Sequence, residues 1–473
     1  QWLLADYNSV TKVWTYNSST VPWLNNNTYT IKSKAKDKAQ NEETVYGQAS
    51  FTCDKDYPSS GITIPQSGEN RSSLATITGT SSDNQGVSGV KIAIQVNPDN
   101  DPSPPAEPPG WFNGTDFTGG APTYFSAQAS DGSFGGTSEN WQINVSTWGF
   151  KTKNKYLILA KAKDIANYEQ TSPSERRFTY DTDKPQSVVT SPADSSVPTV
   201  PPEIKGTAAD NGPGVVSKVE VAIMRVVDSV YWDNTIPDWD ELNPGLEHWT
   251  EVSASSPAYA YWVYNATTPV WTANYKYTIW SRASDNAVPS GNQETVASSN
   301  TFHYDPNAPT SIVSVPSEAY YKTLTLISGT ADDDGMLGSG VAEVKIRIRD
   351  LTRGTTYWKG GFNKWQPGDD SQAWRVVNGT TSWTYGFDDS DWTNNHTYWI
   401  NTQAKDKAGN YELNYATTVF TFDNEQPDST ISTPTAGGYY SLVKPLNSIK
   451  GEASDNASGV KFVEVRIKRQ SSP

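Results

Sequence analysis

The sequence is poor in several residue types, and each shortage excludes a class of protein. Among 473 residues there are one cysteine, two methionines and three histidines. The single cysteine, Cys53, rules out a framework of internal disulfides. The three histidines are scattered, and no HExxH, GxSxG or phosphate-loop pattern accompanies them. We therefore expect no enzyme.

Basic charge and long apolar runs are also scarce. Lys and Arg number 37 against 52 Asp and Glu, which gives a net charge of −15. Nucleic acid is excluded as a partner because its phosphates require clustered basic residues. No run of 18 apolar residues exists, so no membrane span is expected in this segment. An acidic surface of this kind suits cations or a basic partner.

Aromatic residues, in contrast, are abundant. They make up 12% of the chain and include 18 Trp and 25 Tyr, enough bulky surface to fill several small cores. The remaining residues are dominated by Ser, Thr, Asn, Asp, Gly and Pro, which punctuate strands rather than support helices. A length of 473 residues predicts about three domains, and this composition favours β structure in them.

An internal repeat organises the chain. The pattern Tyr-x-Ile-x-small-x-Ala-x-Asp alternates apolar and polar positions like a half-buried strand. Its aspartates are 127, 121 and 121 residues apart. The four copies run from Tyr29, Tyr156, Tyr277 and Tyr398 to Asp37, Asp164, Asp285 and Asp406.

Two further landmarks recur in step with this strand. The first is Ile-x-Gly-x-x-x-Asp, followed by a turn and a β-branched strand. Its glycines and aspartates are Gly79/Asp83, Gly206/Asp210, Gly329/Asp333 and Gly451/Asp455. The second is Phe-x-aromatic-Asp with two prolines seven residues apart, which stiffen an edge strand entering a new domain. Its aspartates are Asp54, Asp181, Asp305 and Asp423.

These landmarks set the expected domain boundaries. They predict three complete domains over residues 55–181, 182–305 and 306–423. Residues 1–54 hold only the C-terminal half of a domain, and residues 424–473 hold only an N-terminal half. A sandwich needs both of its sheets, so neither half can bury its apolar face alone. Two hypotheses follow: the chain continues into a longer repeat polypeptide, or neighbouring copies complete each other by strand complementation.

The stretch Tyr398–Glu412, with Ala404, Asp406 and Asn410, resembles the extracellular Ig-like repeats of bacteria and archaea, which look similar to fibronectin III and cadherin modules. The resemblance implies an all-β fold of tandem Ig-like β-sandwich domains, joined by short proline-containing linkers into a rod. The tyrosine is similar to the tyrosine corner of such sandwiches, although a Cys-Trp-Cys arrangement is absent. Adhesin stalks, surface layers and filaments, at the extracellular cell surface, are the functions that the resemblance implies.

A pair of tryptophans precedes each tyrosine strand, and further aromatics lie in the loops at 101–140 and 351–380. We interpret the pairs as core residues; exposed platforms for sugars are the alternative. The pairs are Trp14/Trp23, Trp141/Trp148, Trp262/Trp271 and Trp383/Trp392. The loop aromatics that would serve carbohydrate binding are Trp111, Phe112, Trp358, Phe362, Trp365 and Trp374.

Calcium is the candidate cofactor. Calcium takes six to eight oxygen ligands, which acidic loops at domain junctions supply; the alternative is that these residues only cap turns. The strand-end aspartates named above form a third set beside the two landmark sets. The candidate ligands are Asp54, Asp83, Asp181, Asp183, Asp210, Asp305, Asp332, Asp333, Asp334, Asp423 and Asp455.

N-glycosylation is expected because sequons recur at equivalent places in the repeat. Several lie three residues after a tryptophan of the pair, and others lie in the aromatic loops. The alternative is that the sequons recur only because the repeats inherited similar sequences. The candidate sites are Asn17, Asn26, Asn144, Asn265, Asn395, Asn113 and Asn378.

The sequence thus predicts a non-catalytic extracellular structural protein that forms or coats a surface filament, sheath or S-layer. An adhesin stalk or a carbohydrate-binding cell-surface protein is the alternative. Expected partners are neighbouring copies of the chain or its own continuation, and glycans for the alternative. No nucleic acid is expected.

Overall fold

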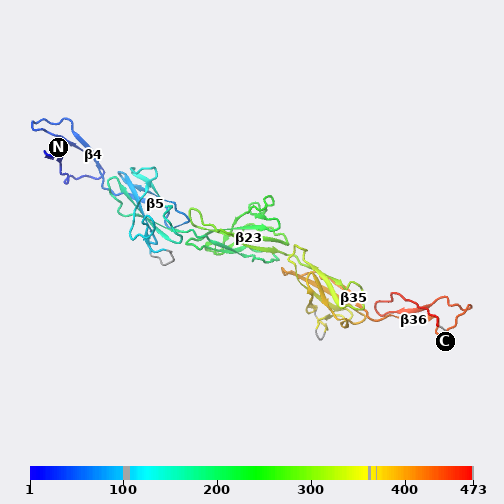
Figure 1. Cartoon of the computed structure of the whole chain (residues 1–473). Coiled ribbons are helices and arrows are strands. Elements are labelled where there is room, and N and C mark those ends of the chain that lie inside the picture. Colours follow the sequence, from blue (N-terminus) through cyan, green and yellow to red (C-terminus); the bar gives the residue numbers. More distant parts are fainter. Residues whose placement is uncertain (100–106, 361–363, 369, 471–473) are drawn as a thin grey trace.

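The computed structural model describes residues 1–99, 107–360, 364–368 and 370–470. Phe362, one of the loop aromatics considered for sugar binding, lies outside these residues. The described residues form mainly antiparallel sheets, in which only β6 with β14 and β26 with β35 pair in parallel, with three short 3-10 turns; no α-helix occurs among them. Figure 1 shows the sheets grouped into three successive sandwiches along an extended molecule, with the two termini at opposite ends. The predicted all-β tandem fold is confirmed.

The first sandwich pairs a four-stranded sheet with a six-stranded sheet. The smaller sheet has the order β11-β12-β7-β5, and the larger has the order β10-β8-β13-β14-β6 with β9 added to β8. The strands are β5 (Ser59–Ile64), β6 (Glu69–Arg71), β7 (Thr76–Ser82), β8 (Val87–Val96), β9 (Gly110–Trp111), β10 (Phe125–Ser126), β11 (Gln128–Ala129), β12 (Ser138–Asn144), β13 (Lys155–Asp164) and β14 (Ser174–Tyr180).

The second sandwich repeats this plan. Its sheets have the orders β15-β16-β22-β21 and β19-β18-β17-β23-β24, with β20 added to β17. The elements are β15 (Gln186–Ser191), β16 (Lys205–Ala209), β17 (Val216–Arg225), β18 (Val230–Asp233), β19 (Asp238–Trp239), β20 (Thr250–Glu251), β21 (Ser253–Ala254), η1 (Pro257–Tyr259), β22 (Trp262–Val263), β23 (Tyr275–Asp285) and β24 (Ser298–Tyr304).

The third sandwich has a four-stranded and a seven-stranded sheet. Their orders are β25-β27-β33-β32 and β26-β35-β34-β28-β29-β30, with β31 added to β28. The elements are β25 (Thr310–Val315), β26 (Tyr320–Tyr321), β27 (Leu326–Asp332), β28 (Val341–Asp350), β29 (Thr356–Trp358), β30 (Trp365–Pro367), η2 (Asp370–Gln372), β31 (Arg375–Val376), β32 (Asn378–Gly379), β33 (Ser382–Gly386), η3 (Asp389–Asp391), β34 (His396–Asp406) and β35 (Thr417–Phe422).

Three two-stranded sheets flank the sandwiches. At the N-terminal end, β1 (Asp6–Asn8) pairs with β2 (Val13–Thr15), and β3 (Asn27–Ser33) pairs with β4 (Gly47–Cys53). At the C-terminal end, β36 (Asp428–Thr433) pairs with β37 (Lys450–Ser454). Nearly all of their side chains are exposed or partly exposed. These sheets therefore lack the covering layer that each complete sandwich has.

One tryptophan lies at the centre of each core, against the glycine of the Ile-x-Gly landmark. Trp141, Trp262 and Trp383 are at most 1% exposed, so the core interpretation of the first tryptophan in each complete copy is confirmed. A Cβ atom on the facing glycine would overlap the indole ring and a backbone carbonyl of the neighbouring strand. Glycine is therefore required at this position, because the ring lies directly on the backbone.

Each tyrosine of the repeat strand forms the tyrosine corner that the sequence predicts. Its hydroxyl accepts a hydrogen bond from the backbone N–H five residues earlier, over 2.7 Å in Tyr29 and Tyr398 and 2.9 Å in Tyr156. Tyr277 forms the same bond at 2.7 Å. The tyrosine ring also stacks on the phenylalanine of the next strand, as Tyr398 does on Phe420 with ring centroids 5.5 Å apart. This corner fixes the entry into the long strand that ends at the site described below.

The glycine requirement gives a direct test of the core. Gly329→Ala should destabilise the third sandwich by about 2–4 kcal/mol, because the added methyl group overlaps the indole of Trp383 and the carbonyl of Ile312. Gly386→Ala in the same sandwich is the matched control, since its Cβ atom would meet nothing within 4 Å. Calorimetric unfolding of the full chain measures both; equal effects of the two substitutions would contradict the packing described.

Candidate functional site

Three aspartates converge at the start of each complete sandwich. One comes from the segment entering the sandwich, one follows the landmark strand, and one ends the long tyrosine strand. In each group the three carboxylate oxygens lie within 4.8 Å of one another. We call these groups the Asp triads: Asp54/Asp83/Asp164, Asp181/Asp210/Asp285 and Asp305/Asp333/Asp406.

The fold explains why these three positions meet. The landmark strand and the long strand lie in opposite sheets, and both end at the edge of the sandwich where the chain enters. In the third sandwich, β27 ends at Asp332 and β34 ends at Asp406, with Asp333 and Asp305 in the connecting segments. The entering segment is held there because Ser339 donates its backbone N–H to Asp305 Oδ2 over 2.8 Å. In the second sandwich, the backbone N–H of Gly214 donates to Asp181 Oδ2 in the same way, over 3.1 Å.

Most triad members are buried although they are acidic, and only Asp54 and Asp210 are partly exposed. Asp164, Asp181 and Asp305 are 0% exposed, and Asp333 is 2% exposed. Burial of several carboxylates without a counter-charge is costly, and repulsion between them adds to that cost. Desolvation, reinforced by Asp210 and Asp285, raises the pKa of Asp181 to about 6. Desolvation and the neighbouring carboxylates likewise raise the pKa of Asp164 and of Asp333.

Some carboxylate oxygens of the triad aspartates receive no hydrogen bond among the described residues. In the first triad, Asp54 Oδ2, Asp83 Oδ1 and Asp164 Oδ2 are all buried and lack a partner among the described residues. The other oxygen of Asp83 accepts two backbone N–H groups, from Gln85 and Gly86. The second and third triads each keep one such oxygen, on Asp210 and Asp333. Buried acceptors without donors, close together, are the arrangement that a hard cation satisfies.

The structure separates the predicted ligands into members and neighbours of the triads. Asp54, Asp83, Asp181, Asp210, Asp305 and Asp333 are members. The long-strand aspartates Asp164, Asp285 and Asp406, which the sequence offered as a third set, are members as well. Asp423 and Asp455 hold the equivalent places before the C-terminal half: Asp423 Oδ2 and Asp455 Oδ2 accept the N–H groups of Ser458 and Gly459, over 3.0 Å and 2.9 Å.

Besides Asp423 and Asp455, three predicted ligands lie outside the triads. Asp183 forms an ion pair with Lys153 at 3.1 Å. Asp332 caps its own turn by accepting the N–H of Gly335 over 3.0 Å. Asp334 accepts the side-chain amides of Asn274 and Asn307, both over 2.7 Å. The run Asp332–Asp334 is therefore dense in sequence only, because successive residues at the end of a strand point in different directions.

Asp183 and Asp334 instead tie one repeat to the next. Lys153 belongs to the preceding sandwich and Asp183 to the linker, so their ion pair spans the boundary. Asp334 lies in the following sandwich, whereas Asn274 lies in the preceding one. At the first boundary, Asp56 takes this role by accepting amides from Asn26 and Asn84 over 3.1 Å and 2.8 Å. Each boundary therefore has a polar bridge beside its triad.

The aromatic loop residues considered for sugar binding are packed into the structure. Phe112 is 3% exposed and stacks on Trp148 with ring centroids 4.2 Å apart. Trp358 is 7% exposed and packs on Phe387 at 4.4 Å. Trp365 packs on Trp358, and partly exposed Trp374 is covered by Arg347, whose guanidinium lies 4.5 Å from its ring. Phe112, Trp358 and Trp365 therefore extend the cores, whereas Trp111 and Trp374 stay partly exposed.

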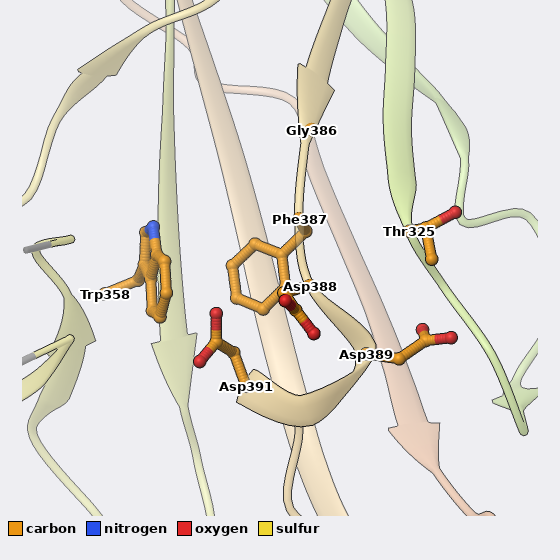
Figure 2. Close-up of a pocket in the computed structure, with 7 residues that line it drawn as sticks. All are labelled: Thr325, Trp358, Gly386, Phe387, Asp388, Asp389 and Asp391. Carbon is orange, nitrogen blue, oxygen red and sulfur yellow. The ribbon is translucent and has the colours of Figure 1, made fainter.

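A shallow pocket in the third sandwich gathers three carboxylates near Trp358 and Phe387 (Figure 2). Each carboxylate is already engaged. Asp388 caps the turn η3 by accepting the N–H of Ser390, and Asp391 pairs with Lys364 at 2.7 Å. Asp389 accepts the N–H of Leu324 over 2.5 Å. The pocket therefore offers a closed network rather than free ligands.

Two of the three histidines contact a carboxylate, whereas the buried Nε2 of His303 has no hydrogen-bond partner among the described residues. His248 contacts Asp240 at 2.9 Å, and His396 contacts Asp350 at 2.8 Å. Cys53 is a partly buried free thiol at the end of β4. All seven predicted glycosylation sites are exposed. In Asn113 and Asn144 the sequon hydroxyl donates to the asparagine Oδ1, over 3.1 Å and 2.7 Å. Their modification stays a prediction, as does the absence of catalysis.

The raised pKa of Asp181 predicts an unusual pH dependence. The folded state holds its proton up to about pH 6, whereas the unfolded state releases it near 3.8. The folded state thus binds more protons between these values, so the free energy of unfolding in EDTA should fall as pH rises from 4 to 7. Thermal unfolding of the second sandwich measures this. Asp181→Asn should flatten the profile; an unchanged slope in this variant would contradict the assignment.

Comparison with solved structures returns tandem repeats from adhesive proteins. A tetra-tandem repeat from the extending region of a large adhesion protein is 16% identical, with 86% of this chain and 84% of that chain covered and a TM-score of 0.31. A Ca2+-stabilised adhesin of an Antarctic bacterium is 14% identical over 84% and 82%, with a TM-score of 0.29. Protocadherin gamma B2 domains 3–6 are 10% identical over 89% of each chain, with a TM-score of 0.26. No family model and no curated protein matches the chain. Because these TM-scores are low, the assignment of the fold depends on the sheets described above and not on these similarities.

Proposed function

We propose that this chain is a non-catalytic structural stalk at the extracellular cell surface, whose sandwich junctions are stiffened by divalent cations, calcium in particular. The observation that carries this proposal is the Asp triad, repeated at three junctions with buried oxygens that lack donors. We keep the repeat boundaries at 55–181, 182–305 and 306–423, so that the first aspartate of each triad belongs to the preceding unit. Among the described residues, no helix is long and apolar enough to cross a membrane.

A cation at a triad would lock two sandwiches together. Asp305 precedes the third sandwich, while Asp333 and Asp406 belong to its two sheets, so one ion would bind the linker and both sheets at once. Backbone bonds already hold Asp305 in place, which lowers the ordering cost of binding. A hard cation with oxygen ligands fits this donor set. The remaining ligands of calcium would be backbone oxygens or water.

A stiff chain of sandwiches suits a filament, a sheath, an S-layer or an adhesin stalk. All of these need length and spacing rather than a pocket. The carbohydrate-binding alternative is weakened because Phe112 and Trp358, two of the loop aromatics that it would use, are buried in the cores. The net charge of −15 favours cation accumulation around the molecule. Glycans on the exposed sequons would lie on the outside of such a stalk.

Calcium should therefore stabilise and stiffen the chain. At one hundred times the dissociation constant, a bound ion adds about 2.7 kcal/mol to the free energy of unfolding of the sandwich that holds it. Isothermal titration should find about one ion per triad, and Asp333→Asn should lose one of them. Asp131→Asn, at an exposed aspartate outside the triads, is the control. Equal stability and equal X-ray scattering dimensions in calcium and in EDTA would contradict the proposal.

Glycosylation has its own test. The exposed sequons predict that the chain from its natural source is heavier than its sequence mass and loses that excess when N-glycans are released. Glycopeptides should contain the loop sites Asn113 and Asn378, which are exposed. Peptide mapping in which both sites are always unmodified would contradict this expectation.

A further inference from the structure

The large sheet of the second sandwich carries a hollow on its outer face, lined by aromatic rings and a carboxylate. Its volume is about 230 Å³. The lining residues come from β17, β18 and β23 and from the segments before β20 and β24: Ala222, Tyr231, Glu247, Trp249, Trp280 and Val296. No member of an Asp triad is among them. We propose that this hollow binds the guanidinium group of an arginine side chain on a partner protein.

The hollow faces away from the core. Along β17, Val221 and Ile223 belong to the core of the second sandwich, so Ala222 between them points to the opposite face of the sheet. The same alternation holds in the third sandwich, where Ile346 and Ile348 belong to the core and Arg347 lies between them. The outer faces of the two large sheets can therefore be compared position by position.

Arg347 occupies the place in the third sandwich that Ala222 occupies in the second. Each residue lies opposite the residue that precedes the triad aspartate of the long strand by five positions. Ala222 lies opposite Trp280, and Arg347 lies opposite Asn401. A methyl group thus stands in the second sandwich where the third has a guanidinium group.

The third sandwich shows what fills this place. The guanidinium of Arg347 lies 4.5 Å from the ring of Trp374, 5.1 Å from Trp399 and 5.7 Å from Tyr415. Its Nη1 donates to Asp370 Oδ2 over 2.7 Å. Aromatic faces attract a cation, and a carboxylate beside them strengthens the attraction. Rings and a carboxylate on this face therefore form a site for arginine, which the chain itself occupies.

The second sandwich keeps the main wall of this site. Trp249 comes directly before β20, and Trp374 comes directly before β31. These two short strands pair with β17 and β28 in the same register, because the residue after each tryptophan lies opposite the residue before Ala222 or Arg347. The two tryptophans are therefore equivalent, and Trp249 borders a place that no arginine of its own strand fills.

The other lining residues supply a second aromatic wall and a negative charge. Tyr231 and Trp280 stack with ring centroids 5.8 Å apart. The indole N–H of Trp249 donates to Glu247 Oε2 over 2.8 Å, which fixes the carboxylate at the hollow. Burial, and next the charge of Glu247, raise the pKa of Tyr231. The field of this carboxylate thus reaches the phenol, and it favours a cation in the hollow.

One guanidinium group already lies on this aromatic surface. Arg282 lies 4.0 Å from the ring of Trp249, and its Nε donates to Glu220 over 2.9 Å. The charge of Arg282 is therefore paired, and its position shows that the rings of this face accept a guanidinium group. Glu247, in contrast, forms no ion pair with Lys or Arg among the described residues.

The surrounding sequence favours a cationic partner. Residues 226–275 contain seven Asp and Glu and no Lys or Arg. The equivalent segment of the third sandwich, residues 351–396, contains four Lys and Arg. An acidic surface raises the local concentration of a basic partner and speeds its association. The second sandwich thus combines an unfilled arginine site with a surface that attracts arginine, and this site adds a partner to the proposed stalk without depending on calcium.

The test is isothermal titration of the full chain with the peptide acetyl-Gly-Arg-Gly-amide in EDTA. The same peptide with citrulline is the control ligand, because citrulline has nearly the shape of arginine and no charge. We expect one site for the arginine peptide, a shift of the Trp249 indole N–H resonance in the nuclear magnetic resonance spectrum, and no binding of the citrulline peptide. Trp280→Ala should weaken binding about tenfold, because it removes one aromatic wall. Failure of the arginine peptide to bind, or equal binding of both peptides, would overturn the proposal.

Exchanging the two equivalent residues makes the test specific. Ala222→Arg should abolish binding, because the chain then fills its own hollow, and Arg347→Ala should add a second site in the third sandwich. Tyr261→Ala is the control variant, since Tyr261 is 64% exposed in the second sandwich and lies outside the hollow. Circular dichroism shows whether each variant keeps its sheets. Unchanged binding by folded Ala222→Arg, or a single site in folded Arg347→Ala, would also overturn the proposal.

Discussion

Each sandwich depends on one contact: a tryptophan ring lying directly on the backbone of a glycine in the same small sheet. Because glycine has no side chain, the ring reaches the middle of the core and its indole N–H can bond the carbonyl next to that glycine, as Trp262 does with Thr207 over 3.0 Å. The contact joins the part of the repeat that comes first in sequence to the part that comes last. A repeat that lacks one of these two parts therefore has an open core.

This dependence accounts for the contrast along the chain. Where both parts are present, tryptophan, tyrosine and phenylalanine rings stack into a closed core, as in the cluster of Trp392, Tyr398 and Phe420. Where one part is present, the same residue types are exposed, as with Trp14 and Phe51. The long loops of the complete sandwiches do not alter this plan. Their aromatic residues, such as Phe112 and Trp358, add further layers to the core.

The closed cores also create the acidic junctions. Both sheets must end at the edge where the chain enters, and an aspartate ends a strand well because its carboxylate accepts nearby backbone N–H groups. Three such ends at one edge bring three carboxylates together, which raises the pKa of Asp181 to about 6 through desolvation first and through Asp210 and Asp285 next. Under the proposed function, a cation bound at the triad would remove this cost and stiffen the junction.

Sequence periodicity was sufficient to predict the strands and the three sets of aspartates, because each recurs at a fixed place in the repeat, whereas the tyrosine corner came from the resemblance to Ig-like repeats. It could not predict which members of an acidic run meet. Asp333 enters the triad while Asp332 and Asp334 do not, and this depends on side-chain direction at the end of β27. It also left the loop aromatics undecided, because burial of Phe112 against Trp148 joins residues far apart in the sequence.

A crystal structure of the chain grown with a lanthanide in place of calcium would show whether the Asp triads bind cations. Anomalous scattering should show one strong peak within each triad, bounded by carboxylates such as Asp54, Asp83 and Asp164. Triads that are well ordered but hold no peak at saturating lanthanide would show that they are not cation sites.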